Sequence, residues 1–95
     1  EEEPNEPFNL YALALEYTKT DSEKATDYFE QLLSKHPNYV ATYYHVGKLY
    51  EELEMEDKAE TAYQKGIEVA TQQNEALALR ELKNAYQEFL DFKEM

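Results

Sequence analysis

Apolar and small residues recur along most of the chain at steps of three and four, the spacing of one face of an α-helix. The clearest case is segment 43–67, in which the short, largely charged stretch 52–57 separates two such faces. The first face carries Tyr43, Val46, Gly47 and Tyr50, and the second carries Ala59, Ala62, Tyr63, Gly66 and Ile67. A short polar connection between two apolar helical faces is typical of antiparallel helices. The pattern therefore predicts a helical hairpin over 43–67.

Both glycines of the chain lie on these apolar faces. Glycine inside a helix costs about 1 kcal/mol relative to alanine, so a glycine at a packing position indicates that another helix approaches closely. We therefore expect Gly47 and Gly66 to be contact points between helices. The alternative, which applies more to Gly66, is that the glycine ends its helix.

The same periodicity predicts helices before and after this hairpin. They are expected from Phe8 to about Thr18, from Thr20 to about His36, from Asn38 through Tyr50, from Glu56 or Asp57 to about Thr71, and from about Glu75 to Phe92. The expected N-caps are Asn5, Thr20, Asn38 and Asn74. Thr20 forms a capping-box pattern with Glu23, and Pro37 ends the second helix because it disfavours helical geometry in the residue before it. No sustained alternation of apolar and polar residues indicates a strand.

An internal repeat appears when the first two hairpins are superimposed. In the first helix of each, Leu10, Leu13, Ala14 and Tyr17 correspond to Tyr43, Val46, Gly47 and Tyr50 at a shift of 33 residues. In the second helix of each, Ala25, Phe29, Leu32 and Leu33 correspond to Ala59, Tyr63, Gly66 and Ile67 at a shift of 34 residues. These residues are the expected packing positions. The last helix adds an inner face of Leu79, Leu82, Ala85, Tyr86, Phe89 and Leu90.

The repeat resembles the tetratricopeptide repeat, a helix–turn–helix unit of about 34 residues. Pro37 matches the proline that closes a unit of this family, whereas Thr71 stands at that place in the second unit. The resemblance implies an all-α fold of two repeats and a C-terminal capping helix, five helices in a short right-handed superhelical segment. The expected organisation is a flexible acidic lead-in (1–5), a first hairpin (6–37), a second hairpin (38–73) and a capping helix (74–95), within a single domain.

Charge and composition narrow the classes of partner. The chain has 21 acidic and nine basic residues and a formal net charge of −12. Such a chain is expected to bind neither nucleic acid nor anionic membranes, because its charge repels both. The absence of cysteine excludes disulfides and thiolate zinc sites. It is compatible with a reducing compartment, so the cytoplasm is the favoured location.

No residues in the sequence form a catalytic or metal-binding pattern. His36 and His45 are not spaced with carboxylates as metal ligands, and neither Ser22 nor Ser34 lies in a glycine-rich turn. The acidic run 51–57 lacks the alternating ligands and central glycine of a calcium loop. We therefore expect no enzymatic activity, no cofactor and no bound metal.

A surface is the remaining candidate site. In the family, the first helices of successive hairpins line a concave groove that binds peptides or helices of other proteins. The resemblance assigns to this face Tyr11, Leu15, Tyr44, His45 and Lys48, with Arg80, Lys83 and Asn84 of the last helix bordering it. We expect the groove to bind a peptide with apolar and acidic side chains, the tyrosine rings supplying contact area and Lys48 or Arg80 pairing a carboxylate.

Two alternatives remain open at this point, and one function of the family is not expected. Tyr11 and Tyr44 would serve packing alone if their rings lay between neighbouring first helices. The family's clamp of lysine, asparagine and arginine for a terminal carboxylate is not expected, because Lys48 is its only base here. The chain would instead be a self-associating structural domain, a weak homo-oligomer, if Phe8, Leu90 or Phe92 met a second copy.

Overall fold

The computed structural model of the chain describes residues 6–95, in which it has five α-helices and no strand. The helices are α1 (Pro7–Tyr17), α2 (Ser22–Lys35), α3 (Ala41–Glu52), α4 (Glu56–Gln72) and α5 (Ala76–Lys93). The predicted all-α fold of five helices is confirmed. The expected lead-in over 1–5 and the expected Asn5 cap lie outside the described residues.

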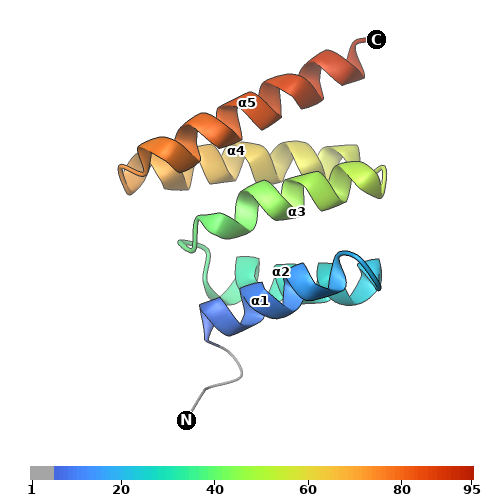
Figure 1. Cartoon of the computed structure of the whole chain (residues 1–95). Helices are drawn as coiled ribbons and strands as arrows, with labels where there is room; N and C mark the ends of the chain where they lie inside the picture. Colours follow the sequence, from blue (N-terminus) through green and yellow to red (C-terminus); the bar gives the residue numbers. More distant parts are fainter. Residues whose placement is uncertain (1–5) are drawn as a thin grey trace.

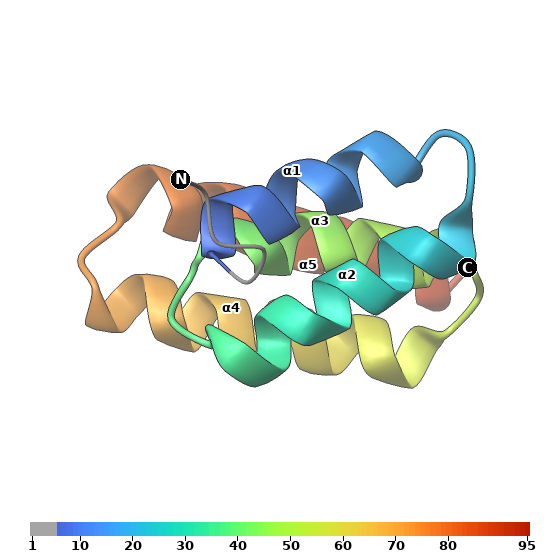
Figure 2. The same ribbon diagram turned by 90° about the horizontal axis from the view of Figure 1, so that it is seen from below.

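The helices form two antiparallel hairpins and a final helix. α1 packs against α2, α3 packs against α4, and α5 lies on α4 and α3 (Figure 1). Seen from below, the helices form two layers, α1, α3 and α5 in one and α2 and α4 in the other (Figure 2). The first helices of the two hairpins therefore share a layer with α5, and the second helices form the other.

One apolar core runs through all five helices. Its largest fully buried side chains include Tyr63, Phe29, Leu10, Leu32, Leu82 and Val46. Small residues lie among these large side chains: Ala14, Ala25 and Ala59 are fully buried. Such interdigitation of large and small side chains gives protein interiors their crystal-like density.

The two glycines lie at helix contacts within this core. A Cβ atom added at Gly47 would lie 2.7 Å from Cζ of the Tyr63 ring. One added at Gly66 would lie too close to Cβ of Tyr43 and 3.1 Å from Cδ2 of Leu82. α4 continues to Gln72, so Gly66 does not end its helix.

Leu13 differs from the sequence prediction. It was expected on the inner face of α1, but its side chain is 38% exposed, whereas the corresponding Val46 of α3 is fully buried. The reason is position in the array: α3 packs against α2, α4 and α5, while α1 packs chiefly against α2. The face of α1 that carries Leu13 therefore lacks the covering that Val46 receives.

Three expected N-caps were also wrong. Asp21, not Thr20, caps α2, because its carboxylate accepts a hydrogen bond of 3.2 Å from the Lys24 backbone N–H. α3 begins after Val40 with no side-chain cap, rather than after Asn38. α5 likewise begins after Glu75 without a side-chain cap. Asn74 has a φ of 57° instead, and this left-handed conformation, which asparagine tolerates well, ends α4.

Candidate functional site

Three predicted groove residues form a cluster of rings between α1 and α3. Tyr11 of α1 makes an edge contact with His45 of α3, with ring centroids 5.6 Å apart. Tyr44 makes a second edge contact with His45 at 5.3 Å. The Lys48 Nζ lies 5.7 Å from the centroid of the Tyr44 ring, a cation–π arrangement. All four side chains are half-buried, so they combine contact with the core and contact with solvent.

Two hollows adjoin this cluster on the layer of α1, α3 and α5. One, of about 250 Å³, is lined by Tyr11, Val40, Ala41, Tyr44, His45, Glu75, Leu77, Ala78, Glu81 and Leu82. The other, of about 310 Å³, is lined by Tyr44, His45, Lys48, Glu81, Asn84, Ala85 and Glu88. Because they share Tyr44, His45 and Glu81, the two hollows form one continuous surface. We call this surface the front groove.

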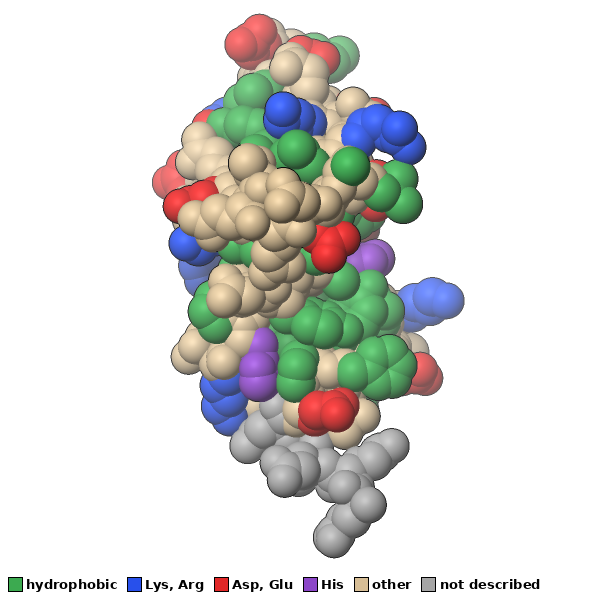
Figure 3. All heavy atoms as spheres, turned by 90° about the vertical axis from the view of Figure 1, so that its left-hand side faces the viewer, with side chains coloured by type: hydrophobic (Ala, Val, Ile, Leu, Met, Phe, Trp, Pro, Cys, Tyr) green, Lys and Arg blue, Asp and Glu red, His purple; other side chains and the backbone are tan. Residues whose placement is uncertain are grey.

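Apolar side chains form part of the surface at the end of the molecule that adjoins the front groove. Figure 3 views the end at which α1, α3 and α5 begin, and hydrophobic side chains gather there over α1 and the start of α3. Leu77, at the start of α5, lines the front groove and is 60% exposed. The groove therefore combines an apolar end with a more polar stretch along α5.

Carboxylates dominate the charged side chains of the front groove. Glu75, Glu81 and Glu88 line it from α5 and its N-cap, and Lys48 is the only lysine or arginine among the described side chains that line the two hollows. The Lys48 Nζ lies 3.9 Å from Oε1 of Glu88. Burial lowers the pKa of His45 below its ordinary value, and the Glu81 carboxylate opposes that shift. His45 is therefore neutral at neutral pH.

The structure brings together only part of the predicted site. Tyr11, Tyr44, His45 and Lys48 line the front groove, whereas Leu15 is half-buried and packs against the core.

Of the three α5 residues expected to border the groove, Asn84 lines it, whereas Arg80 and Lys83 do not. Arg80 and Lys83 are exposed on α5 and are absent from the lining of both hollows. The burial of Leu82, Ala85 and Phe89 fixes the rotation of α5, which turns Glu81 and Glu88 toward α3 instead. The sequence placed Leu82, Ala85 and Phe89 correctly on the inner face of α5, but it did not determine which flank of that face meets α3, so these carboxylates were missed.

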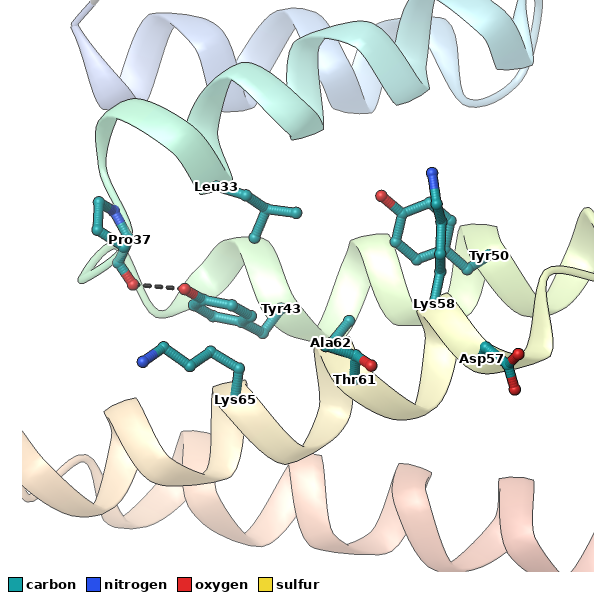
Figure 4. Close-up of a pocket in the computed structure, with 9 residues that line it drawn as sticks. All are labelled: Leu33, Pro37, Tyr43, Tyr50, Asp57, Lys58, Thr61, Ala62 and Lys65. Carbon is teal, nitrogen blue, oxygen red and sulfur yellow. Dashed lines mark hydrogen bonds between the residues drawn. The ribbon is translucent and has the colours of Figure 1, made fainter.

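A third hollow lies on the opposite side of the molecule from the front groove, where α2, α3 and α4 meet. It has a volume of about 420 Å³ and is lined mainly by apolar parts of Leu33, Pro37, Tyr43, Tyr50, Ala62 and neighbouring side chains. Figure 4 shows Lys58 and Lys65 extending into this hollow from α4. It also shows the hydrogen bond between Tyr43 and Pro37. The Tyr43 hydroxyl donates to the Pro37 carbonyl at 2.5 Å. We call it the back hollow; the sequence did not predict it.

The structure gives no sign of a metal centre or a membrane span in the part of the chain that it describes. No three His, Cys, Asp or Glu side chains within residues 6–95 are grouped so that they could hold a metal ion. None of the five helices is both long and apolar enough to cross a bilayer.

Comparisons with known proteins agree on one family. A family model for the tetratricopeptide repeat matches residues 9–39. No curated protein sequence gives a significant match. A solution NMR structure of a tetratricopeptide repeat domain protein from Salinibacter ruber is 45% identical, with a TM-score of 0.87, covering 93% of this chain and 90% of that one. A crystal structure of a tetratricopeptide repeat domain protein from the same organism is 44% identical, with a TM-score of 0.84, covering 88% of this chain and 96% of that one. With this identity over most of both chains, the protein belongs to the tetratricopeptide repeat family.

Proposed function

We propose that this chain is a non-catalytic interaction module that binds a peptide or helix of another protein in the front groove. The fold is that of a protein-interaction module in general. The observation that carries the specific proposal is the gathering of half-buried rings from α1 and α3 around hollows that α5 completes. Aromatic side chains that pack on one side and are exposed to solvent on the other are typical of binding surfaces.

The shape of the front groove favours an elongated ligand. Its two hollows share three residues and extend from the apolar end at Leu77 along α5 to Glu88. A peptide lying along it would place apolar side chains against Leu77 and the ring of Tyr11. Its polar groups would then meet Glu81, Asn84 and Lys48. Contacts of both kinds allow the groove to fix the register of a bound segment.

A binding selection followed by NMR mapping tests this proposal. Peptides selected against the chain from a random display library would be titrated while backbone amide shifts are recorded. We expect the largest shifts in α1, α3 and α5 around Tyr11, Tyr44 and His45. Shifts confined to α2 and α4 would contradict the proposal.

Two matched variants separate binding from stability in that test. Tyr44→Leu removes a groove ring, whereas Tyr28→Leu removes a half-buried ring of α2 that stacks on Tyr17, with centroids 5.8 Å apart. Both changes remove one ring–ring contact and similar apolar area. Binding should weaken with Tyr44→Leu and stay unchanged with Tyr28→Leu, provided that both variants keep the helical circular dichroism of the parent.

Self-association is a second candidate, favoured by apolar side chains at the two ends of the array. Phe8 is 62% and Phe92 69% exposed. An open-ended array can present such residues to another copy. The net charge of −12 opposes close approach of two copies. Sedimentation velocity over a wide range of concentration discriminates the two functions, because a chain that stays monomeric at every concentration excludes self-association.

A further inference from the structure

We infer, on the basis of the proposed function, that the front groove takes a basic segment: an apolar or aromatic side chain flanked by arginine or lysine. The inference rests on the sign of the charge in the groove. Three carboxylates, those of Glu75, Glu81 and Glu88, line its hollows against the single ammonium group of Lys48. This lining is acidic even though the sequence led us to expect bases there.

The one cation of the groove is already engaged. Lys48 pairs with Glu88 at 3.9 Å and lies over the ring of Tyr44. An incoming carboxylate would therefore compete with Glu88 for Lys48 and would face Glu81 across the shared part of the two hollows. An incoming guanidinium would instead meet Glu81, whose side chain is exposed and whose carboxylate suits the bidentate geometry of arginine.

The aromatic rings of the groove favour the same ligand. The face of a tyrosine ring attracts cations, and arginine stacks on such faces while pairing with a nearby carboxylate. Tyr44 and Glu81 line both hollows, and Tyr11 adjoins them in the smaller one. The tyrosine rings and the Glu81 carboxylate thus lie on one binding surface, which suits the planar, positively charged guanidinium group of arginine.

The charge of the whole chain acts in the same direction. A net charge of −12 attracts a basic segment from a distance and repels an acidic one. Complementary charge at an interface mainly raises the association rate and selects among partners. The back hollow provides an internal contrast, because Lys58 and Lys65 outnumber Asp57 among its lining residues. Both lysines already pair with glutamates, Lys58 with Glu30 at 3.5 Å and Lys65 with Glu68 at 3.4 Å, so an acidic segment would meet competition there as well.

Two probe peptides of equal length test the inference. One alternates arginine with leucine and phenylalanine, and the other has glutamate in place of every arginine. Each is titrated into the full chain at about 0.15 M salt, where long-range attraction is screened, and amide shifts are recorded. We expect the arginine peptide to shift amides around Tyr11, Tyr44 and His45, and the glutamate peptide to leave them unchanged.

Charge-matched variants distinguish the groove from general attraction to an acidic protein. The double variant Glu81→Gln/Glu88→Gln removes two groove carboxylates, and Asp27→Asn/Glu56→Gln removes two exposed carboxylates from the other layer. The groove variant should bind the arginine peptide about three- to tenfold more weakly, as expected for two exposed charge pairs. The control variant should change the dissociation constant by less than about twofold.

The outcomes separate failure of this inference from failure of the proposed function. If the glutamate peptide binds the groove as well as the arginine peptide, or if both double variants weaken binding equally, the basic-partner inference is overturned and the groove remains a binding site. If the arginine peptide shifts only amides of α2 and α4, or if neither peptide shifts groove amides, the proposed function fails and the inference fails with it.

Discussion

At the scale of single residues, the two glycines define how closely the helices can pack. A Cβ at Gly66 would collide with Cβ of Tyr43, an atom fixed to the backbone of α3, whereas a Cβ at Gly47 would collide with the Tyr63 ring. Tyr63 is fully buried, and its hydroxyl donates to the Glu51 carboxylate, so this ring has little room to move. A side chain is nonetheless more easily displaced than a backbone-bound Cβ, which makes Gly66 the less tolerant position.

We therefore predict that Gly66→Ala destabilises the chain even though alanine favours helix. Overpacking a core typically costs about 1–3 kcal/mol and exceeds the gain of about 1 kcal/mol in helix propensity. Urea unfolding should show a net loss of about 1–2 kcal/mol for Gly66→Ala and a smaller loss for Gly47→Ala. Ser34→Ala, at an exposed position of α2, is the control and should be neutral or slightly stabilising. A Gly66→Ala variant as stable as the parent would show that these helices are not in close contact.

At the scale of elements, capping decides where α2 begins. Thr20 and Asp21 both have side chains that can cap a helix, and the capping-box pattern with Glu23 favours Thr20. In the structure Asp21 has an extended backbone conformation and accepts the Lys24 N–H, while Thr20 is exposed. The carboxylate also lies at the positive end of the helix dipole.

Single alanine substitutions distinguish these two caps. Asp21→Ala should lower the free energy of unfolding by about 1 kcal/mol, the usual cost of losing an N-cap. Thr20→Ala should change it by less than about 0.5 kcal/mol, as for an exposed loop position. Asp21→Asn keeps the acceptor oxygen and should recover most of the loss. If urea unfolding showed Thr20→Ala to be the more costly change, the capping box would be the correct assignment.

The sequence predicted which helices exist better than where they begin. Periodic apolar residues specify a helix along its whole length, so each expected helix is present. An N-cap depends on the backbone conformation of one residue, and several polar residues near each end compete for it. Leu13 shows a different limit, because its exposure depends on whether another helix covers that face, which the repeat pattern alone does not determine.

The front groove was predictable in part for a related reason. Tyr11, Tyr44, His45 and Lys48 follow from the internal repeat, which relates α1 to α3 residue by residue. α5 lies outside the two repeats, so its rotation had to be inferred from its apolar residues alone. Leu82 and Phe89 are buried as expected, and the flank of that face that carries Glu81 and Glu88 meets α3. The groove charge changes sign with that rotation.

At the scale of the whole molecule, tyrosine–glutamate hydrogen bonds connect each helix to the next from α2 to α5. Tyr50 of α3 donates to Glu30 of α2 at 2.9 Å, and Tyr63 of α4 donates to Glu51 of α3. Tyr86 of α5 donates to Glu60 of α4 at 2.9 Å. Each bond gives the hydroxyl of a buried or half-buried ring a charged acceptor, which is stronger than a neutral one.

These hydrogen bonds make the free energy of unfolding depend on pH in the alkaline range. Burial, and next the hydrogen bond to a glutamate, raise the pKa of Tyr50 and of Tyr63 above the ordinary value of 10.0. The folded chain therefore keeps these two protons at a pH where the unfolded chain has lost them. Their contribution is complete below about pH 10 and is lost as the pH rises above it, at up to about 1.4 kcal/mol per pH unit for each tyrosine.

Urea unfolding of the parent chain should accordingly show a free energy of unfolding that falls steeply between about pH 10 and about pH 11. The double variant Tyr50→Phe/Tyr63→Phe loses both hydroxyls and should be less stable at neutral pH, because Glu51 loses its tyrosine donor and Glu30 keeps only Lys58, at 3.5 Å. Its stability should fall less steeply over the alkaline range. Lysines also lose protons there, but they do so in both proteins, so the difference between the two slopes isolates the tyrosines. Equal slopes would mean that these hydroxyls ionise as readily in the folded chain as in the unfolded one, and that their hydrogen bonds to Glu30 and Glu51 do not stabilise the array.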